Sequence, residues 1–347
     1  MAENYLGITG FDFVEFASPN PEALHQLFMS MGFSRLKRHK TKKIDYYRQH
    51  DIHFLINREP GTFAANFTKE HGPAACSTGW RFTNAETAYK TALTRGAKNG
   101  GEGDYHFADG KPLLSIRGVG DSLIYFVDDY NDPKRWEKLG FVDLEMPDVA
   151  PEKGFMLVDH LTNNVRKGQM EPLAKFYKEV FGFEEVRYFD IRGKKTGLVS
   201  YALRSPCGSF CIPINEGTEA KSQINEYLEE YQGPGIQHIA FLTPNLVSTM
   251  EKLEGSKLQT LDIDEEYYKD VFDKVPGVTE DHKKIEKFNL LVDGDEEGYL
   301  LQIFTKNCIG PIFFEFIQRK NHLGFGEGNF GALFRSIEKD QEKRGYI

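Results

Sequence analysis

Three short apolar segments of the 347-residue chain each carry one side chain that could bind a metal ion. They read LVDHLTNNV around His160, GIQHIAFLT around His238 and FFEFIQR around Glu315. Side chains alternate along a strand, so each of these residues points to one face and its immediate neighbours to the other. The three residues are also almost equally spaced along the chain, as duplicated strands would place them. We therefore expect all three side chains to face the interior of one barrel.

Two imidazoles and one carboxylate on one face of an octahedral ion are the ligand set of non-haem Fe(II) oxygenases. Three coordination positions stay open in that arrangement. A 2-oxo acid can fill two of them through its carboxylate and keto oxygens, and dioxygen can fill the third. Nitrogen and oxygen ligands without a thiolate favour Fe(II) over a structural zinc. The pattern predicts one Fe(II) per chain.

Two structural explanations compete with the metal. A single histidine in an apolar strand is more often a hydrogen-bonded core residue than a ligand. Glu315 is costly to bury among phenylalanines unless a cation or a strong donor meets it, and Arg319, an even number of positions along the same strand, could supply an ion pair. The other eight histidines lie in polar or loop-like contexts or lack a partner carboxylate, and we assign them no role.

The elements that must position these residues repeat along the chain. A polar stretch rich in proline and glycine, 147–154, is typical of a linker and divides the chain into domains 1–150 and 151–347. Each half opens as strand, helix and strand. The apolar spacing of both helices is helical, with Leu24, Leu27, Phe28 and Met31 in the first and Leu173, Phe176, Tyr177 and Val180 in the second.

A second strand-helix unit follows in each half, which indicates an α+β protein of two open β-barrel domains, each built from two βαβββ units. The position that matches His160 in the first half is about Glu15, so we expect that half to hold no metal and to serve as scaffold. The last twenty residues predict an amphipathic helix with Phe330, Leu333, Phe334 and Ile337 on its apolar face.

Composition excludes several function classes. A net charge of -9 opposes sequence-independent binding to nucleic acid. The N-terminus has no basic segment before an apolar run, and no stretch of about eighteen apolar residues occurs, so we expect a cytoplasmic protein that does not span a membrane. Four cysteines without a Cys-x-x-Cys pair predict reduced thiols.

Around these segments the chain resembles the 4-hydroxyphenylpyruvate dioxygenase family of the vicinal oxygen chelate superfamily. The resemblance runs through almost the whole second half, in the ordered blocks VDH, PINE, KSQINEYL, GIQHIAF, DGDEEGYLLQIFTK, FFEFIQR and GFGEGNFGALF. In the first half it rests mainly on FDFVEFASP. It implies glyoxalase-like barrels with Fe(II) only in the second, and a C-terminal helix that gates the pocket through Phe330.

The resemblance also implies pocket residues. Residues with catalytic roles would be Ser200, Asn215, Gln223, Gln237 and Gln302, and substrate-binding residues would be Phe304, Phe313, Phe325, Asn329 and Phe330. Such a set suits a phenol, because aromatic faces bind the ring while neutral amides bind its hydroxyl. Without the resemblance, Gln223 and Gln302 could equally be ordinary surface or edge-strand amides. Gly217 replaces a proline common in the family, which puts the path from Asn215 to Gln223 in doubt.

The implied reaction is Fe(II)-dependent oxidative decarboxylation, ring hydroxylation and side-chain migration, which converts 4-hydroxyphenylpyruvate and O2 to homogentisate and CO2 in tyrosine and phenylalanine catabolism. The alternative is a 4-hydroxymandelate synthase acting on the same substrate. A metal-free binding protein of the same fold is a further alternative, disfavoured by the complete ligand set. We also expect a homo-oligomer, either a dimer or a tetramer.

Overall fold

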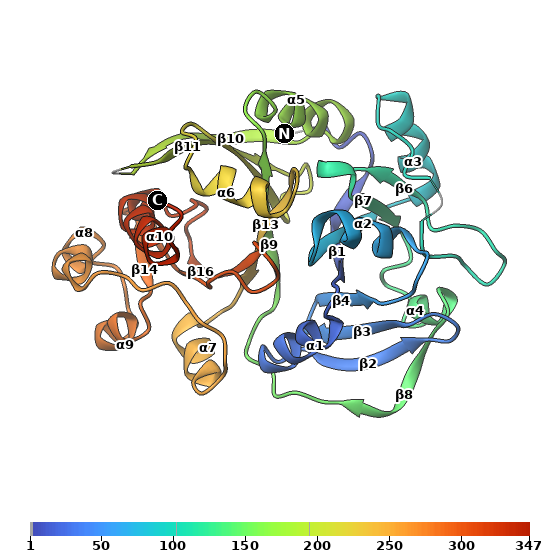
Figure 1. The fold of residues 1–347 in the computed structure, drawn as a ribbon, viewed down its shortest axis with the longest axis horizontal. Helices are drawn as coiled ribbons and strands as arrows, with labels where there is room; N and C mark the ends of the chain where they lie inside the picture. Colours follow the sequence, from blue (N-terminus) through green and yellow to red (C-terminus); the bar gives the residue numbers. More distant parts are fainter. Residues whose placement is uncertain (1–2, 102, 194) are drawn as a thin grey trace.

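The computed structural model of the protein describes residues 3–101, 103–193 and 195–347. In these ranges the chain forms two eight-stranded mixed sheets, one from each half of the sequence, with helices around them (Figure 1). The first sheet ends at Asp148 and the second begins at Leu157. The predicted boundary at residue 150 falls in the connection, and the division of the chain into domains 1–150 and 151–347 stays a prediction.

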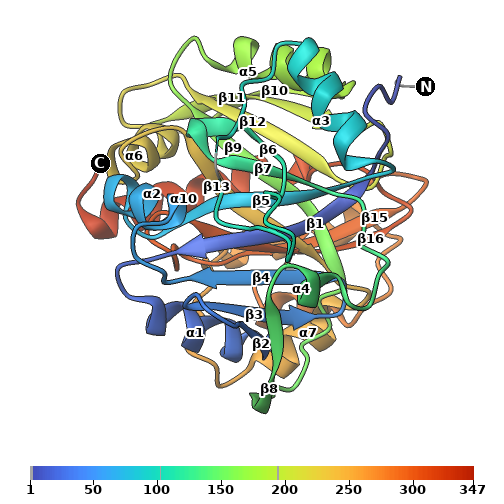
Figure 2. The same cartoon turned by 90° about the vertical axis from the view of Figure 1, so that its right-hand side faces the viewer.

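The first sheet consists of β1 (Ile8–Ala17), β2 (Ser34–His39), β3 (Ile44–Gln49), β4 (Ile52–Asn57), β5 (Ala74–Phe82), β6 (Ser115–Arg117), β7 (Leu123–Val127) and β8 (Phe141–Asp148). Their order across the sheet is β6-β7-β5-β1-β4-β3-β2-β8. Figure 2 looks onto this sheet and shows β5, β1, β4 and β3 side by side.

The second sheet consists of β9 (Leu157–Val165), β10 (Glu184–Arg192), β11 (Gly197–Arg204), β12 (Cys211–Gly217), β13 (Gly235–Leu242), β14 (Leu291–Gly294), β15 (Tyr299–Phe304) and β16 (Phe313–Lys320). Their order is β10-β11-β12-β9-β13-β16-β15-β14. The three strands that carry His160, His238 and Glu315 are therefore adjacent, at the middle of this sheet.

The helices are α1 (Pro21–Ser30), α2 (Phe63–His71), α3 (Ala85–Thr94), α4 (Arg135–Lys138), α5 (Met170–Phe176), α6 (Gln223–Glu230), α7 (Leu246–Leu253), α8 (Val271–Lys274), α9 (His282–Lys287) and α10 (Phe330–Arg344). Helix α5 continues into a π-helical turn, Tyr177–Phe181. Short 3-10 turns lie at Val119–Asp121, Glu265–Lys269 and Glu327–Asn329. The amphipathic helix predicted near the start of each half is confirmed, as α1 in the first half and α5 in the second.

The predicted βαβββ organisation is also confirmed. Strands β1 and β4 pair in parallel across one unit, as do β9 and β12, and β13 and β16, across two others. The second unit of the first half departs from this plan, because its last strand, β8, pairs with β2 at the far edge. Each sheet curls around its own interior, which gives the α+β architecture of two open barrels expected from the sequence.

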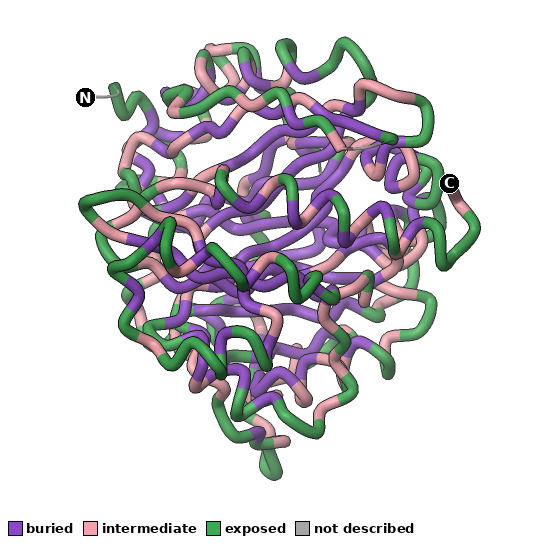
Figure 3. The backbone as a smooth tube through the Cα atoms, turned by 90° about the vertical axis from the view of Figure 1, so that its left-hand side faces the viewer, coloured by how far each residue is buried: buried purple, intermediate pink, exposed green. Residues whose placement is uncertain are grey.

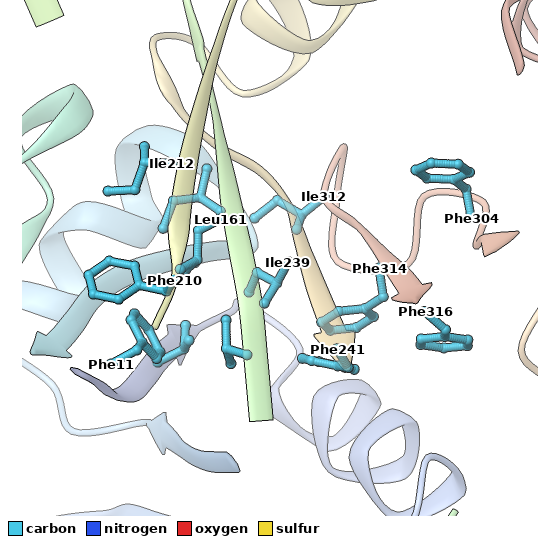
Figure 4. Packing of buried hydrophobic residues seen from close by; sticks show 14 of the residues in the cluster. Phe11, Leu161, Phe210, Ile212, Ile239, Phe241, Phe304, Ile312, Phe314 and Phe316 are labelled. Carbon is cyan, nitrogen blue, oxygen red and sulfur yellow. The ribbon is translucent and has the colours of Figure 1, made fainter. Parts of the chain in front are cut away.

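The two sheets share a hydrophobic core on the face opposite the metal-ligand candidates. Leu161, Ile239 and Phe314, each next in sequence to one of those candidates, are almost completely buried there (Figure 4). Rings from both halves meet in the same core, with the centroids of Phe11 and Phe210 5.8 Å apart. Burial of this apolar surface fixes which face of each central strand points away from the core. Figure 3 shows buried stretches of the backbone running through the middle of the molecule, with exposed stretches mainly around them.

Two β-bulges interrupt the alternation that the sequence predicts. In the pairing of β9 with β13, His160 lies opposite Ala240 and Val158 opposite Phe241. Asp159 therefore has no residue opposite it on β13. Gln237 is skipped in the same way. The prediction that both neighbours of each histidine point to the other face is therefore wrong for the preceding residue, since a bulge places two consecutive side chains on one side.

The same pairing corrects the match between the two halves. In β1, Asp12 is skipped between Phe11 and Phe13 as Asp159 is skipped in β9. Phe13 therefore takes the place of His160, and Glu15 takes the place of Thr162. The prediction that Glu15 matches His160 is wrong by two positions, although the expectation that no histidine stands there holds.

Helix α10 lies beside the second sheet (Figure 1). Its buried Glu338 carboxylate accepts hydrogen bonds from the backbone N–H groups of Lys195 and Thr196, both at 2.9 Å, in the connection between β10 and β11. Ser336 donates to the carbonyl of Asp262 at 2.6 Å. The helix is thus attached to the barrel along its length and not only at its start.

Candidate metal centre

The side chains of His160, His238 and Glu315 converge inside the second barrel. One ligand atom from each lies within 4.8 Å of the other two, and all three residues are buried. His160 Nε2 is 3.0 Å and His238 Nε2 is 3.4 Å from Glu315 Oε2. The three strands that the sequence singles out therefore do bring these groups to one point.

Each histidine is oriented by the bulge residue that precedes it. The Nδ1–H of His160 donates to Asp159 Oδ2 at 2.7 Å, and the Nδ1–H of His238 donates to Gln237 Oε1 at 3.0 Å. Because Nδ1 is used in this way in both rings, Nε2 is the atom that faces Glu315 and the one through which each ring would bind a cation. The Thr162 hydroxyl lies 3.0 Å from His238 Nε2.

The charges of the three groups are strongly coupled. Burial opposes charge on His160, but the Glu315 and Asp159 carboxylates outweigh it and raise the pKa of that ring to about 9. Burial also opposes charge on Glu315, yet the two imidazoles hold the pKa of its carboxyl at about 2. Burial lowers the pKa of His238. A cation that takes this site must therefore displace a proton from His160.

Glu315 has a further chain of hydrogen bonds behind it. Gln302 Nε2 donates to Glu315 Oε1 at 2.9 Å, and Asn329 Nδ2 donates to Gln302 Oε1 at 3.0 Å. The Tyr267 hydroxyl donates to Asn329 Oδ1 at 2.6 Å. A Cβ at Gly326, whose φ is +80°, would lie 1.6 Å from Gln302 Oε1, so this turn accepts only glycine. The chain links the carboxylate to the residue before α10.

The competing Glu315–Arg319 ion pair is not what forms. Within the described part of the chain, Arg319 binds Asp159 through two parallel hydrogen bonds, Nε to Oδ1 at 2.8 Å and Nη2 to Oδ2 at 2.9 Å. Glu315 is left facing the two histidines. A buried carboxylate beside two imidazoles is the situation in which a bound cation best compensates burial.

A cavity opens in front of the three groups, and eight of the ten predicted pocket residues line it: Ser200, Asn215, Gln223, Gln237, Phe304, Phe313, Phe325 and Phe330. The other two, Gln302 and Asn329, lie behind Glu315 and not on the cavity wall. Gln302 contacts Glu315 directly and Asn329 contacts Gln302, and a role of either residue toward the substrate stays a prediction.

Aromatic rings form most of the wall nearest the histidines. Phe313 stacks on His238 with centroids 4.8 Å apart, and Phe304 meets the same ring edge-on at 6.2 Å. On the other side, the Phe325 ring lies 5.7 Å from His160. From α10, Phe330, Leu333, Phe334 and Ile337 also face the cavity. The predicted apolar face of the C-terminal helix is thus the face turned toward the metal centre.

The glycine that replaces the family's proline does not displace Gln223. Gly217 ends β12, and a Cβ there would lie 2.3 Å from Ser222 Oγ. That hydroxyl caps α6 by accepting from the Asn225 N–H at 3.3 Å. Gln223 is therefore the first residue of a capped helix and reaches the cavity wall.

Several residues of the site are absent from the sequence prediction. Thr162 lies two positions after His160 on the same strand face, and that spacing is a usable signal. Phe189 also lines the cavity, with its ring 5.1 Å from that of Phe330, but nothing in its sequence context marks it. Asp159 escapes prediction because a bulge brings it to the histidine side, and the sequence suggests Arg319 as a partner of Glu315 and not of Asp159.

The donor set fits a divalent first-row metal. It offers two imidazole nitrogens and one carboxylate, without a thiolate, and the open side faces a cavity. The described cysteines are free thiols, as predicted, and lie outside this ligand set. Among the described residues no helix is long and apolar enough to cross a membrane.

Comparison with known proteins agrees with this arrangement. The family profile described as "Hydroxyphenylpyruvate dioxygenase, HPPD, N-terminal" matches residues 2–146, and the profile "Glyoxalase/Bleomycin resistance protein/Dioxygenase superfamily" matches residues 157–285. A solved mutant of 4-hydroxymandelate synthase from Streptomyces coelicolor superposes with a TM-score of 0.83 at 22% identity, over 96% of this chain and 99% of that one. These likenesses confirm the expected vicinal oxygen chelate fold.

Two curated relatives match along their full length. Protein MelA of Shewanella colwelliana is 55% identical over 346 residues, which cover 99% of this chain and 99% of that protein. The 4-hydroxyphenylpyruvate dioxygenase of Pseudomonas aeruginosa is 43% identical over 354 residues, which cover 99% of this chain and 97% of that protein. Identity at this level over nearly the whole of both chains means that the protein belongs to the 4-hydroxyphenylpyruvate dioxygenase family of oxidoreductases.

Proposed function

We propose that the protein converts 4-hydroxyphenylpyruvate and O2 to homogentisate and CO2, with one Fe(II) bound by His160, His238 and Glu315. The observation that carries the proposal is the buried cluster of these three groups at the head of an aromatic cavity. Fe(II) at that site would supply coordination positions for the 2-oxo acid and for dioxygen, together with the electrons that activate O2.

The polar groups of the cavity orient the substrate. Gln237 Oε1 already accepts from His238 Nδ1 and, at 3.4 Å, from Asn215 Nδ2. The amide NH2 of Gln237, Nε2, is then the group available to donate to a substrate oxygen. Ser200 and Asn215 are cross-strand partners on β11 and β12, so their side chains face the same part of the cavity. Neutral donors of this kind bind a phenol hydroxyl without taking its proton.

The aromatic wall and α10 hold the ring and keep water out. The Phe304 and Phe313 rings lie beside His238 and meet edge-on at 71°, with centroids 6.3 Å apart. A phenyl ring placed in the cavity has both an aromatic face and an aromatic edge to pack against. Phe330 and Phe334 cover the opposite side from the helix. Exclusion of water protects reactive intermediates from side reactions, which is the usual purpose of such a lid.

The experiment is product identification. The purified full chain is incubated with 4-hydroxyphenylpyruvate, Fe(II), ascorbate and O2, and the products are separated by chromatography and identified by mass. Homogentisate supports the proposal. 4-Hydroxymandelate as the main product would contradict it in favour of the synthase, and the presence of both Phe304 and Phe330 in the wall is our reason for favouring ring attack. The Glu315→Gln protein is the matched control, since it retains the shape of the side chain and lacks its charge.

We propose further that the enzyme is a cytoplasmic homo-oligomer. Size-exclusion chromatography with light scattering tests the dimer or tetramer predicted from the family.

A further inference from the structure

We propose that Asp159 and Arg319 are positioning residues that fix His160 toward the metal and tie the metal centre to the segment leading into α10. The inference rests on the proposed metal site but not on the identity of the product. Neither residue contacts the cavity in which substrate is expected.

The first half of the inference follows from the bulge in β9. The extra residue at Asp159 brings its carboxylate to the same side as the His160 ring. Asp159 Oδ2 then accepts from His160 Nδ1, while both carboxylate oxygens accept from Arg319. A carboxylate held by two guanidinium N–H groups cannot turn away, so it fixes both the proton position and the rotation of the imidazole.

The second half follows from the remaining contacts of Arg319. Its Nη1 donates to two backbone carbonyls beyond the end of β16, those of His322 at 3.2 Å and Gly324 at 2.6 Å. Its Cζ lies 5.9 Å from the centre of the Phe325 ring, which in turn contacts His160. A single guanidinium therefore holds the partner of a metal ligand and the turn that sets Phe325 in the cavity wall.

The first half of the molecule contains a natural control. Asp12 is the equivalent bulge residue, and its buried carboxylate also binds arginines, Arg81 at 2.9 Å and Arg135 at 2.5 Å. The next residue there is Phe13, which cannot bind a metal. The aspartate-arginine contacts at Asp12 can therefore act only in folding. A role of Asp159 in the metal centre must appear as a difference in metal binding between the Asp159 and Asp12 variants.

The test compares Asp159→Asn with Asp12→Asn in the full chain after removal of metal by chelation. Each protein is titrated with Co²⁺ by calorimetry, and the visible absorption of bound Co²⁺ reports the ligand geometry. We expect Co²⁺ affinity to fall by about ten- to a hundredfold in Asp159→Asn, with a changed spectrum, and to stay within about twofold of wild type in Asp12→Asn. Equal affinity in wild type and Asp159→Asn, or equal losses in both variants, would overturn the positioning of His160.

Arg319→Lys tests the connection to α10. Lysine retains the charge but cannot bind the carboxylate and two carbonyls together. Hydrogen exchange of the amides in 321–330 is expected to accelerate about tenfold in this variant and to stay unchanged in Asp12→Asn. Unchanged exchange in Arg319→Lys would overturn the connection.

Thermal melting identifies any variant that does not fold. Should Asp159→Asn fail, Asp159→Glu replaces it, because the added methylene displaces the carboxylate from His160 and affinity is again expected to fall. The outcomes also separate the two proposals. A wild-type chain that binds Co²⁺ but forms no homogentisate contradicts the proposed product alone, whereas unchanged affinity in Asp159→Asn contradicts the present inference alone.

Discussion

The centres of the two barrels are built on equivalent backbones with different side chains. The second barrel has His160, His238 and Glu315 at its centre, and strand pairing matches them to Phe13, Ser77 and Tyr125 in the first. Both centres retain the bulges and the aspartate before the first position. The bulged backbone is therefore common to both halves, while the ability to bind a metal depends on three side chains.

The first centre is filled instead by its own polar and aromatic groups. Glu15 is completely buried and accepts hydrogen bonds from Asn57 at 2.8 Å, Tyr105 at 2.6 Å and Ser77 at 2.5 Å. Burial and the nearby Asp104 carboxylate raise the pKa of Glu15 to about 7. The three donors favour the charged form of Glu15, but burial and Asp104 outweigh them, whereas at Glu315 the two imidazoles outweigh burial. The comparison shows how neighbours decide the state of a buried carboxyl.

The largest expected effect comes from removing the charge that distinguishes the two centres. Glu315→Gln is expected to lower dioxygenase activity by roughly a thousandfold and to abolish tight Co²⁺ binding, because the remaining histidines make an incomplete set. The equivalent change Tyr125→Phe removes a hydroxyl that accepts from the Asp104 N–H at 3.0 Å, and it should leave both measurements unchanged. Equal losses in the two variants would break the distinction between the barrels.

The second prediction concerns pH. A proton on His160 stabilises the metal-free chain fully below the ordinary histidine pKa of 6.5, and this stabilisation is lost as the pH rises through about 9. Since the metal displaces that proton, Co²⁺ affinity should rise by about tenfold per pH unit between pH 7 and pH 8.5. Calorimetry in buffers of different ionisation enthalpy should show about one proton released per ion at pH 7. No release would contradict the coupled charges described here.

The third prediction uses the difference in how the centres are closed. The first barrel is filled by its own rings, whereas α10 covers the second. Deleting residues after Gly328 should therefore uncouple the reaction, so that homogentisate accounts for roughly half or less of the O2 consumed. An oxygen electrode combined with product quantification measures the ratio. Deletion of the three residues after Arg344 is the matched control, and unchanged coupling in the longer deletion would count against a gating helix.

The smallest effect is expected at Glu15. Its pKa is raised above the ordinary 4.5, so the fold prefers the neutral form of Glu15. The contribution of this group to the free energy of unfolding is therefore full below pH 4.5 and is lost as the pH rises through about 7. Glu15→Gln stays neutral at every pH and should raise the free energy of unfolding at pH 8 by about 1 kcal/mol, with little change at pH 5. Urea unfolding at both pH values measures this, and metal affinity should not change. A variant that is less stable than wild type at pH 8 would show that the charged Glu15 carboxylate does not destabilise the fold.

The sequence was sufficient for the ligand triad because three uncommon residue types stand in three apolar strands. The repeat and the amphipathic helices were predictable for the same reason, since burial leaves a periodic pattern. The sequence was not sufficient to predict the hydrogen-bond partners of the triad. The bulges at Asp159 and Gln237 depend on which backbone groups pair across strands, and that information does not appear in residue types.

The same limit explains the wrong match of Glu15 and the hydrogen bonds that residue types did not predict. Matching Glu15 to His160 requires knowing that Asp12 is skipped in the pairing of β1 with β5. Placing Gln302 and Asn329 behind Glu315 requires knowing the path of the turn at Gly326, where only the structure shows how closely the backbone approaches an amide. Short-range patterns therefore predicted the ligands, and long-range pairing determined what supports them.

The bulges also have a consequence for transplanting this chemistry. Because each skipped residue is the one that orients the following ring, a ligand and its support are encoded together as the dipeptides Asp159-His160 and Gln237-His238. Two such dipeptides, inserted with their extra residue into adjacent antiparallel strands of an unrelated barrel, would bring pre-oriented imidazoles with them. Deletion of Asp159 or of Gln237 would remove a bulge and the hydrogen-bond partner of the following histidine in one step.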